Sequence, residues 1–231
     1  MNLDYLNEHR DRVLDLAVEH LELSATALLI AILVALPLGI AVSRFPSLSV
    51  PVLGALDLLY TIPTLALLSF LIPTLGIGRR PAILVLAAYA QLSLVRNIGT
   101  ALRGVDPALL EAARGMGMTG PQTLLKVRLP LAAPILLAGV RIAAVSIISL
   151  ASVTAWVNAG GLGTLLFDGI TRDYPSMILA GTLAIVAIAL AVDALFRLLE
   201  RLTPTARAYG ATRARRELSV PGLSGKAPSL P

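Results

Sequence analysis

The sequence predicts an all-α membrane protein with about five transmembrane helices. Of its 231 residues, 56% are hydrophobic and only 14% are charged, and the mean hydropathy is +0.81. Soluble domains usually have about 25% charged residues. The apolar residues also form long runs, whereas a soluble amphipathic helix shows them as periodic stripes. These observations indicate a chain that crosses a lipid bilayer several times.

Five apolar runs are long enough to span a membrane, because a span needs about 20 apolar residues to cover roughly 30 Å of hydrocarbon. In chain order these runs are 21–43, 50–75, 82–103, 131–157 and 177–200. Pro63 and Pro73 are expected to interrupt the second run, since proline lacks a backbone donor. Gly160, Gly161 and Gly163 are expected to loosen the end of the fourth. Broken helices at membrane depth often line a pathway, and plain kinks explain these residues equally well.

The two ends of the chain differ in charge from the spans between them. Residues 1–20 are predicted to be an extracytoplasmic or interfacial segment, because acidic residues precede any apolar run and exclude a signal peptide. His9 and His20 lie there without other metal ligands nearby. Residues 203–231 are predicted to be a disordered basic tail on the cytoplasmic side, which leaves 21–202 as the membrane domain. The chain has no cysteine, so neither a disulfide nor a thiolate metal site is expected.

The distribution of Lys and Arg predicts that the loop 104–130 is cytoplasmic. In that orientation twelve basic residues lie inside and five lie outside, while Arg96 and Arg141 are within spans, which accounts for all 19. The outside set is Arg10, Arg12, Arg79, Arg80 and Arg172. The positive-inside rule favours this orientation. Because much of the net charge of +5 falls in the tail, it indicates anionic lipid and not nucleic acid.

Asp57, Arg96 and Arg141 are ionisable residues well inside the predicted spans, where such groups are costly and are candidates for function. At about 1.5 Å per residue, Asp57, Arg96 and Arg141 all lie roughly 10–15 Å from the cytoplasmic edge. Asp57 is therefore expected to pair with Arg96 or Arg141. A clamp between helices is favoured over a substrate contact. Asp193 has its own partner four residues on, at Arg197.

The stretch 111–130, EAARGMGMTGPQTLLKVRLP, has the glycine spacing of a dinucleotide-binding turn. A true fingerprint of that kind follows a strand, opens a helix and has an acidic residue about 20 positions later. Here the glycines follow a helix-like segment, and an apolar span with Arg141 comes next. No Walker A loop is present either. The nucleotide interpretation is therefore rejected.

The same stretch predicts two short helices joined by a turn. Asp106 and Pro107 are a good N-cap and first-turn pair, so the first helix is expected from Pro107 to about Gly115. Thr119 and Gln122 match a capping box for a second helix. Leu129-Pro130 is expected to break that helix before the next span. Small side chains along the first helix and its exit (Ala112, Ala113, Gly115 and Gly117) would let another protein approach closely, although an ordinary capped connector fits the spacing as well.

These residues resemble the EAA motif of ATP-binding-cassette (ABC) importer permeases. Glu111, Ala112, Ala113, Gly117, Leu129 and Pro130 match that motif, with Val127 where the family often has isoleucine. The resemblance covers about Ser24–Glu200 and implies the type I importer permease fold. Two flanking stretches, VDPALLEAARGMGM and TIPTLALLSFLIPTLGIG, resemble the osmoprotectant branch, which takes up glycine betaine, choline or carnitine. The AGGLG stretch is similar both to that branch and to methionine-type permeases.

The resemblance implies that other proteins share the work of transport. The loop would dock as a coupling helix on a separate dimeric ABC ATPase, which would bind the ATP, so no cofactor is expected on this chain. The external loops are too short for a substrate-binding domain, so an extracytoplasmic binding protein is expected. A second permease subunit, identical or a sister chain, would complete the pathway. The location implied is the inner or plasma membrane of a prokaryote.

Three alternatives differ in what the sequence must contain. An importer for methionine or another small amino acid would share the loop. A passive channel would need no docking loop, so the EAA pattern counts against it. A membrane enzyme would need converging carboxylates, a metal set or a nucleophile–base pair, whereas Asp57 and Asp193 lie on separate spans.

Overall fold

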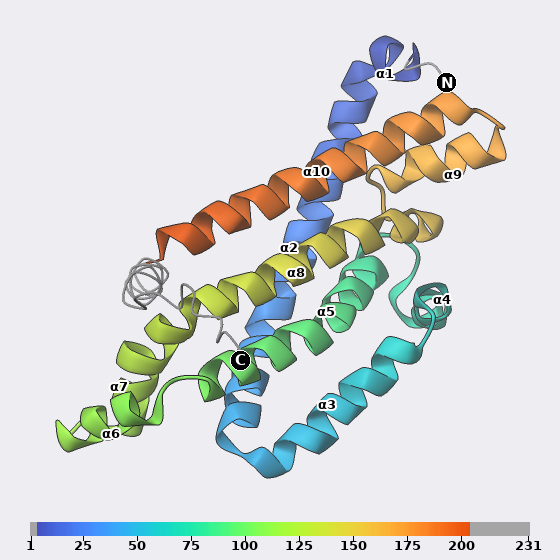
Figure 1. Cartoon of the computed structure of the whole chain (residues 1–231). Coiled ribbons are helices and arrows are strands. Elements are labelled where there is room, and N and C mark those ends of the chain that lie inside the picture. The colour runs from blue at the N-terminus through green and yellow to red at the C-terminus, as the bar shows by residue number, and fades with distance from the viewer. Residues whose placement is uncertain (1–3, 204–231) are drawn as a thin grey trace, which may run out of the picture.

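The computed structural model describes residues 4–203 of the chain, and within them the secondary structure is entirely helical (Figure 1). Most of the predicted basic tail, from residue 204 on, lies outside the described residues. The elements are α1 (Asp4–Glu8), α2 (Arg10–Arg44), α3 (Pro46–Thr61), α4 (Thr64–Leu75), α5 (Arg79–Arg103), α6 (Pro107–Gly115), α7 (Gly120–Thr123), the π-helical turn η1 (Leu124–Arg128), α8 (Leu129–Thr154), the 3-10 turn η2 (Ala155–Val157), α9 (Gly163–Thr171) and α10 (Pro175–Leu202).

The predicted membrane spans correspond to long apolar helices. In residues 4–203, 4 continuous helical stretches are long and apolar enough to cross a membrane, namely Arg10–Arg44, Arg79–Arg103, Gly120–Val157 and Pro175–Leu202. The pair α3–α4 accounts for the fifth span if it is counted as one broken crossing. The prediction of an all-α membrane protein with about five spans is confirmed.

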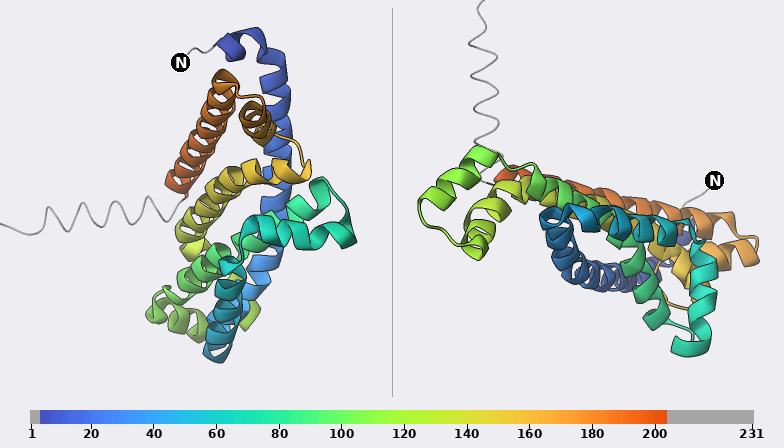
Figure 2. Two further views of the ribbon diagram at one scale, coloured as in Figure 1. Left: turned by 90° about the vertical axis from the view of Figure 1, so that its right-hand side faces the viewer. Right: turned by 90° about the horizontal axis from the view of Figure 1, so that it is seen from below.

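The second span is broken much more sharply than a kink. Helices α3 and α4 meet at an angle of 92°, so the predicted run 50–75 is two elements and not one (Figure 2). Ile62 is extended, with φ −70° and ψ 128°, because Pro63 disfavours the helical conformation in the residue before it. Pro73 remains inside α4. Of the two prolines, only Pro63 interrupts the span.

The first helix begins well before the apolar run that predicted it. Helix α2 is 35 residues long, which at about 1.5 Å per residue exceeds roughly 30 Å of hydrocarbon. No proline or glycine interrupts the sequence between Arg10 and residue 21. The helix therefore also includes the charged residues that precede the apolar run. His20 consequently lies within a long helix and not before it. Its buried ring bonds through Nε2 to the carbonyl oxygen of Ile148 at 2.9 Å.

The core lies where α2, α5 and α8 pack together, with α10 against α8 (Figure 1). Small residues let these helices approach closely, as is common at helix interfaces in membranes. A Cβ added to Gly39 on α2 would lie 2.5 Å from Ile98 of α5, and one added to Gly139 on α8 would lie 2.7 Å from Asn97. Along α2, the small residues Ala27, Ala31 and Ala35 are all 0% exposed.

The two ends of the bundle carry different elements. Helices α1 and α9 lie at one end, and α6 and α7 lie at the opposite end together with the last turns of α10 (Figure 1). With five crossings the amino terminus and the loop 104–130 are on opposite sides of the membrane. The positive-inside rule predicts that the α6–α7 end is the cytoplasmic one.

Single cysteines introduced into this cysteine-free chain test that orientation. We expect an impermeant thiol reagent, applied to intact cells, to label Asp11→Cys, because Asp11 is exposed at the α1 end. Thr119→Cys, exposed at the other end, should react only after the membrane is permeabilised. Labelling of position 119 from outside would contradict the orientation.

Candidate functional site

The first helix of the loop 104–130 forms where its capping residues predicted it. Helix α6 runs from Pro107 to Gly115, and the Asp106 carboxylate accepts a hydrogen bond from the backbone N–H of Ala108 at 2.9 Å. The helix is closed by Gly117, which has φ +78°, a left-handed conformation that favours glycine. Gly117 N–H bonds to the Arg114 carbonyl at 2.9 Å. The turn between the two loop helices thus depends on the glycine backbone.

The second loop helix is capped as predicted but does not end as predicted. Thr119 and Gln122 form both hydrogen bonds of a capping box at the start of α7. The expected break at Leu129-Pro130 is wrong, because helix continues from Gly120 to Val157. The π-helical turn η1 lets Leu129 N–H bond to the carbonyl of Leu124, five residues back. Pro130, which has no N–H to donate, directly follows this π-helical turn, and the helix continues through it.

The two alanines of the motif differ in burial. Ala112 is exposed, whereas Ala113 is 1% exposed and faces this chain, as does its neighbour Leu110. Ala113 is therefore not available to a partner, whereas Ala112 stays a predicted contact. Glu111 is exposed, and no ion pair joins it to Arg114 in the described structure.

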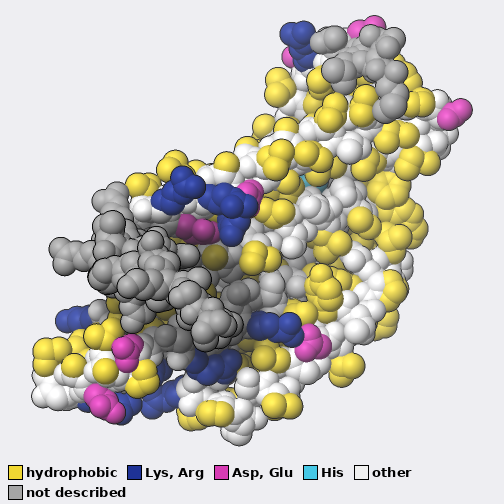
Figure 3. Space-filling model, viewed as in Figure 1, with side chains coloured by type: hydrophobic (Ala, Val, Ile, Leu, Met, Phe, Trp, Pro, Cys, Tyr) yellow, Lys and Arg dark blue, Asp and Glu magenta, His cyan; other side chains and the backbone are white. Residues whose placement is uncertain are grey.

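Large apolar side chains project from this end of the molecule. Leu109 is 46% exposed, Met116 76% and Leu125 63%. Gly115 lies exposed among them. Figure 3 shows hydrophobic groups spread over the end that α6 and α7 form, with charged groups beside them. Such a surface outside the bilayer is typical of a protein contact.

A basic cavity of about 550 Å³ lies behind the loop, between it and the end of α2. Arg44, Arg114 and Arg128 contribute to its wall, and no acidic residue does. Leu124 of the π-helical turn also lines it. The space between the loop and this end of α2 is therefore lined by positive charge and by no negative charge.

A second, larger cavity of about 950 Å³ lies at the break between α3 and α4. Its wall combines residues 60–64 of the break with one face of α5 and one face of α8. Of the predicted pathway residues, Pro63 and Arg96 line it. The wall is partly polar, through Ser93, Asn97, Ser146 and Ser149. A cavity of this size is in the range of small-molecule sites.

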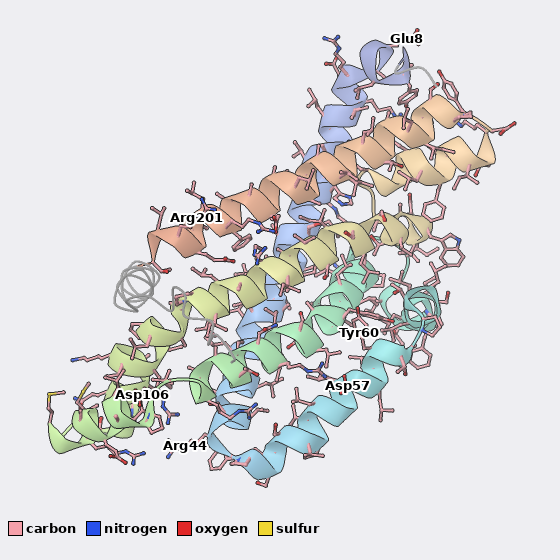
Figure 4. All side chains as sticks on the ribbon, viewed as in Figure 1. Glu8, Arg44, Asp57, Tyr60, Asp106 and Arg201 are labelled. Atoms are coloured by element: carbon pink, nitrogen blue, oxygen red, sulfur yellow. The ribbon has the colours of Figure 1, made fainter. Side chains whose placement is uncertain are left out.

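Asp57 of α3, which is labelled in Figure 4, forms an ion pair with Arg96 beside this cavity, and this confirms the predicted pairing. One guanidinium nitrogen, Nη2, lies 2.9 Å and 3.2 Å from the two carboxylate oxygens. The side chains are nonetheless 53% and 54% exposed. Half-exposed charges at membrane depth are costly against lipid tails. This face is therefore suited to water or to another protein.

We expect Asp57→Ala to lower the yield of folded protein more than Asp57→Asn. Both substitutions remove the charge, but asparagine keeps an oxygen that can accept a hydrogen bond from Arg96, whereas alanine leaves the guanidinium unpaired. The measurement is the monodisperse fraction in detergent by size-exclusion chromatography. Equal yields of wild type and both variants would show that the pair does not stabilise the bundle.

Arg141 belongs to a separate charge cluster. Its Nη1 bonds to Asp193 at 2.9 Å and its Nε to Glu200 at 2.8 Å, both on α10. Asp193 also accepts from Arg197 at 2.6 Å, as predicted from their spacing. The Arg141, Asp193 and Glu200 side chains are 20–25% exposed. Arg141 thus joins α8 to α10 and does not line the cavity at the broken span.

The three glycines after α8 form a close contact and not a loosened helix end. Gly160 and Gly161 have φ of +85° and +77°, and the Gly161 N–H donates to the Glu19 carboxylate at 3.0 Å. A Cβ on Gly163 would lie 2.1 Å from the backbone oxygen of Ser152. These residues pack the loop against α2 and α8, away from the larger cavity.

An aromatic pair at the larger cavity was not predicted from the sequence. Tyr60 of α3 and Tyr89 of α5 have ring centroids 5.5 Å apart and both line the cavity. Tyr89 donates its hydroxyl hydrogen bond to the carbonyl of Ile62, at the helix break. The only local signal was the position of Tyr60, three residues before Pro63, because the pairing depends on how α3 packs against α5.

Known proteins are similar to this chain over most of its length. The family model described as "Binding-protein-dependent transport system inner membrane component" matches residues 27–203. The carnitine transport permease protein OpuCB of Listeria monocytogenes is 40% identical over 203 residues, which cover 87% of this chain and 93% of the relative. The osmoprotectant import permease protein OsmW of Salmonella typhimurium is 40% identical over 208 residues, 87% of this chain and 97% of the relative.

A further relative and a solved structure agree with these matches. The choline transport system permease protein OpuBB of Bacillus subtilis is 36% identical over 203 residues, covering 87% of this chain and 94% of the relative. An inward-facing structure of the MetNI methionine ABC transporter superposes with a TM-score of 0.73 at 24% identity, over 80% of this chain and 93% of the other. At that identity the structural match supports the fold alone.

Proposed function

This chain belongs to the family of binding-protein-dependent transport system inner membrane components, and from that membership we propose that it forms half of the pathway of an ATP-driven importer for compatible solutes such as glycine betaine, choline or carnitine. The observation that carries the proposal is the likeness, at 36–40% identity over nearly full length, to permeases named for carnitine, choline and osmoprotectants. The chain is a multi-pass membrane protein of this family.

The energy for transport comes from a separate ATPase dimer that docks on the cytoplasmic loop. The exposed face of α6 and α7, with Leu109, Ala112 and Met116, supports this assignment because it is apolar, protrudes from the bundle and is not covered by the described part of the chain. Gly117, Leu129 and Pro130 act by setting the direction of the loop helices relative to α8. Glu111 is exposed beside this face and available to a basic group of the ATPase.

A second permease subunit covers α3. That helix has no buried residue among its 16, and its Asp57 forms the half-exposed ion pair with Arg96 of α5. Lipid is a poor neighbour for these charges, whereas a second bundle would enclose them together with the cavity at the broken span. An extracytoplasmic binding protein delivers substrate at the opposite end, near α9. An importer for methionine shares this architecture, but the named sequence relatives favour quaternary ammonium compounds.

Co-purification followed by ATPase measurement tests the proposal. The full-length chain is purified from its native membrane, reconstituted with its ATPase and binding protein, and supplied with glycine betaine, choline, carnitine or methionine. We expect a several-fold rise in ATP hydrolysis with at least one quaternary ammonium compound and none with methionine. Stimulation by methionine alone would replace the proposed substrate class, and a chain without an ATPase partner would contradict the importer assignment.

A further inference from the structure

Two aromatic rings, one from α3 and one from α5, line the cavity at the broken span. The Tyr60 and Tyr89 rings are inclined at 51° to each other, with centroids 5.5 Å apart. Tyr89 is held by its hydroxyl bond to the Ile62 carbonyl. Tyr60 is 56% exposed, and among the described residues its hydroxyl has no hydrogen-bond partner. Tyr60 therefore presents an open ring to the cavity and not a packed core side chain.

Arg96 supplies the only charged side chain in the described wall of this cavity. Its Nη2 is engaged by Asp57, whereas no acceptor in residues 4–203 bonds to its Nε or Nη1. These N–H groups can bind a carboxylate. Asp57, at the rim, keeps the local net charge near zero. One cavity thus combines aromatic faces with free guanidinium donors.

This combination matches the two ends of a small zwitterion. A trimethylammonium group has no N–H and cannot donate a conventional N–H hydrogen bond, so aromatic faces are its most specific ligands. A carboxylate is recognised best by a guanidinium, which offers several donors in fixed geometry. The polar wall residues Ser93 and Asn97 lie on the same face of α5 as Arg96.

We propose that this cavity is a substrate-binding site within the membrane subunit itself, in which Tyr60 and Tyr89 contact the trimethylammonium group and Arg96 contacts the carboxylate. The assignment rests on the proposed function, which supplies the substrate class. It goes further, because it gives the permease a selective site of its own in addition to the one on the binding protein. Choline, which has no carboxylate, uses only the aromatic part of the site.

The test uses the complete complex of permease and ATPase in proteoliposomes, without the binding protein, so that any saturable binding of labelled glycine betaine reports this site. We expect Tyr60→Leu to weaken binding about 3- to 30-fold, the effect of losing one cation–π contact. Tyr60→Phe keeps the ring and should bind within about 2-fold of wild type. Phe70→Leu removes an aromatic ring that is 77% exposed outside the cavity and should bind as wild type does.

A second variant separates the two ends of the zwitterion. Arg96→Gln should weaken binding of glycine betaine while choline binding is retained or becomes tighter, because Asp57 is then left without its partner. Equal loss for both compounds would indicate a purely structural role for Arg96 and would contradict the assignment of the carboxylate contact.

The outcomes distinguish this site from the proposed function. Suppose that the wild-type complex with its binding protein imports quaternary ammonium compounds. If the complex alone then shows no saturable binding, or if Tyr60→Leu binds like wild type, the site assignment is wrong and the proposed importer function is retained. If the wild type imports none of the three compounds, the proposed function fails and the site assignment fails with it.

Discussion

Gly117→Val is expected to abolish substrate uptake while the permease still inserts and assembles. Gly117 has φ +78°, and a β-branched residue is strained there. No atom lies within 4 Å of the position that a Cβ would take, so a clash is not the cause. The strain would be relieved by turning α6 away from its present direction relative to α7. The ATPase would then lose its mechanical connection to α8.

Because a coupling element links two sites, its disruption should separate their activities and not lower both alike. We expect the Gly117→Val complex either to hydrolyse no ATP or to hydrolyse it without responding to loaded binding protein. Gly117→Asn is the matched control, since asparagine tolerates the left-handed conformation better than other non-glycine residues. Normal uptake by the valine variant would show that the loop is only a connector.

Substitutions that test docking of the ATPase should be made at exposed residues of the loop. A bulky residue at Ala113, which is 1% exposed, would disturb packing inside this chain and would not report on the ATPase. Ala112 and Met116 are exposed on the same short helix and its exit. Substitutions at these two positions can be interpreted as effects on a partner.

Arg141→Met should cause the largest loss of folded protein among single substitutions of the charged residues. Arg141 bonds to both Asp193 and Glu200, and methionine would leave Glu200 without its arginine while Asp193 keeps Arg197. An acidic group left unpaired near the bilayer is costly. We expect a several-fold fall in the monodisperse fraction after extraction.

A matched pair of variants isolates the electrostatic cause. Arg141→Lys keeps the charge but lacks the planar fork that reaches two carboxylates, so an intermediate yield is expected. Adding Glu200→Gln to Arg141→Met should restore part of the yield, because the unpaired carboxylate is removed. A wild-type yield for Arg141→Met alone would contradict the role given to this cluster.

Local signals predicted the loop well because helix caps act over a few residues. Asp106 with Pro107, and Thr119 with Gln122, cap their helices as expected from sequence. Local signals did not predict which face of each loop helix is buried. Whether Ala112 or Ala113 is exposed depends on what packs against α6, and no pattern within nine residues determines that.

The spans show the same division between local and tertiary causes. The apolar runs predicted where the chain crosses the membrane, but they did not predict where each helix begins. Helix α2, for example, starts at Arg10 and not near residue 21. Pro63 indicated a break, yet the 92° angle depends on how α4 packs against the neighbouring helices. The pairing of Tyr60 with Tyr89 follows from contact between α3 and α5, which no sequence motif reports.

The most direct test of the account is accumulation of labelled glycine betaine in sealed proteoliposomes that contain the permease, its ATPase and external binding protein. The account predicts that the internal concentration rises above the external one only when ATP is present on the side of the α6–α7 loop. Loss of the gradient with Gly117→Val would link that accumulation to the loop. Equilibration of the solute to equal concentrations, with or without ATP, would identify a passive channel and contradict the account.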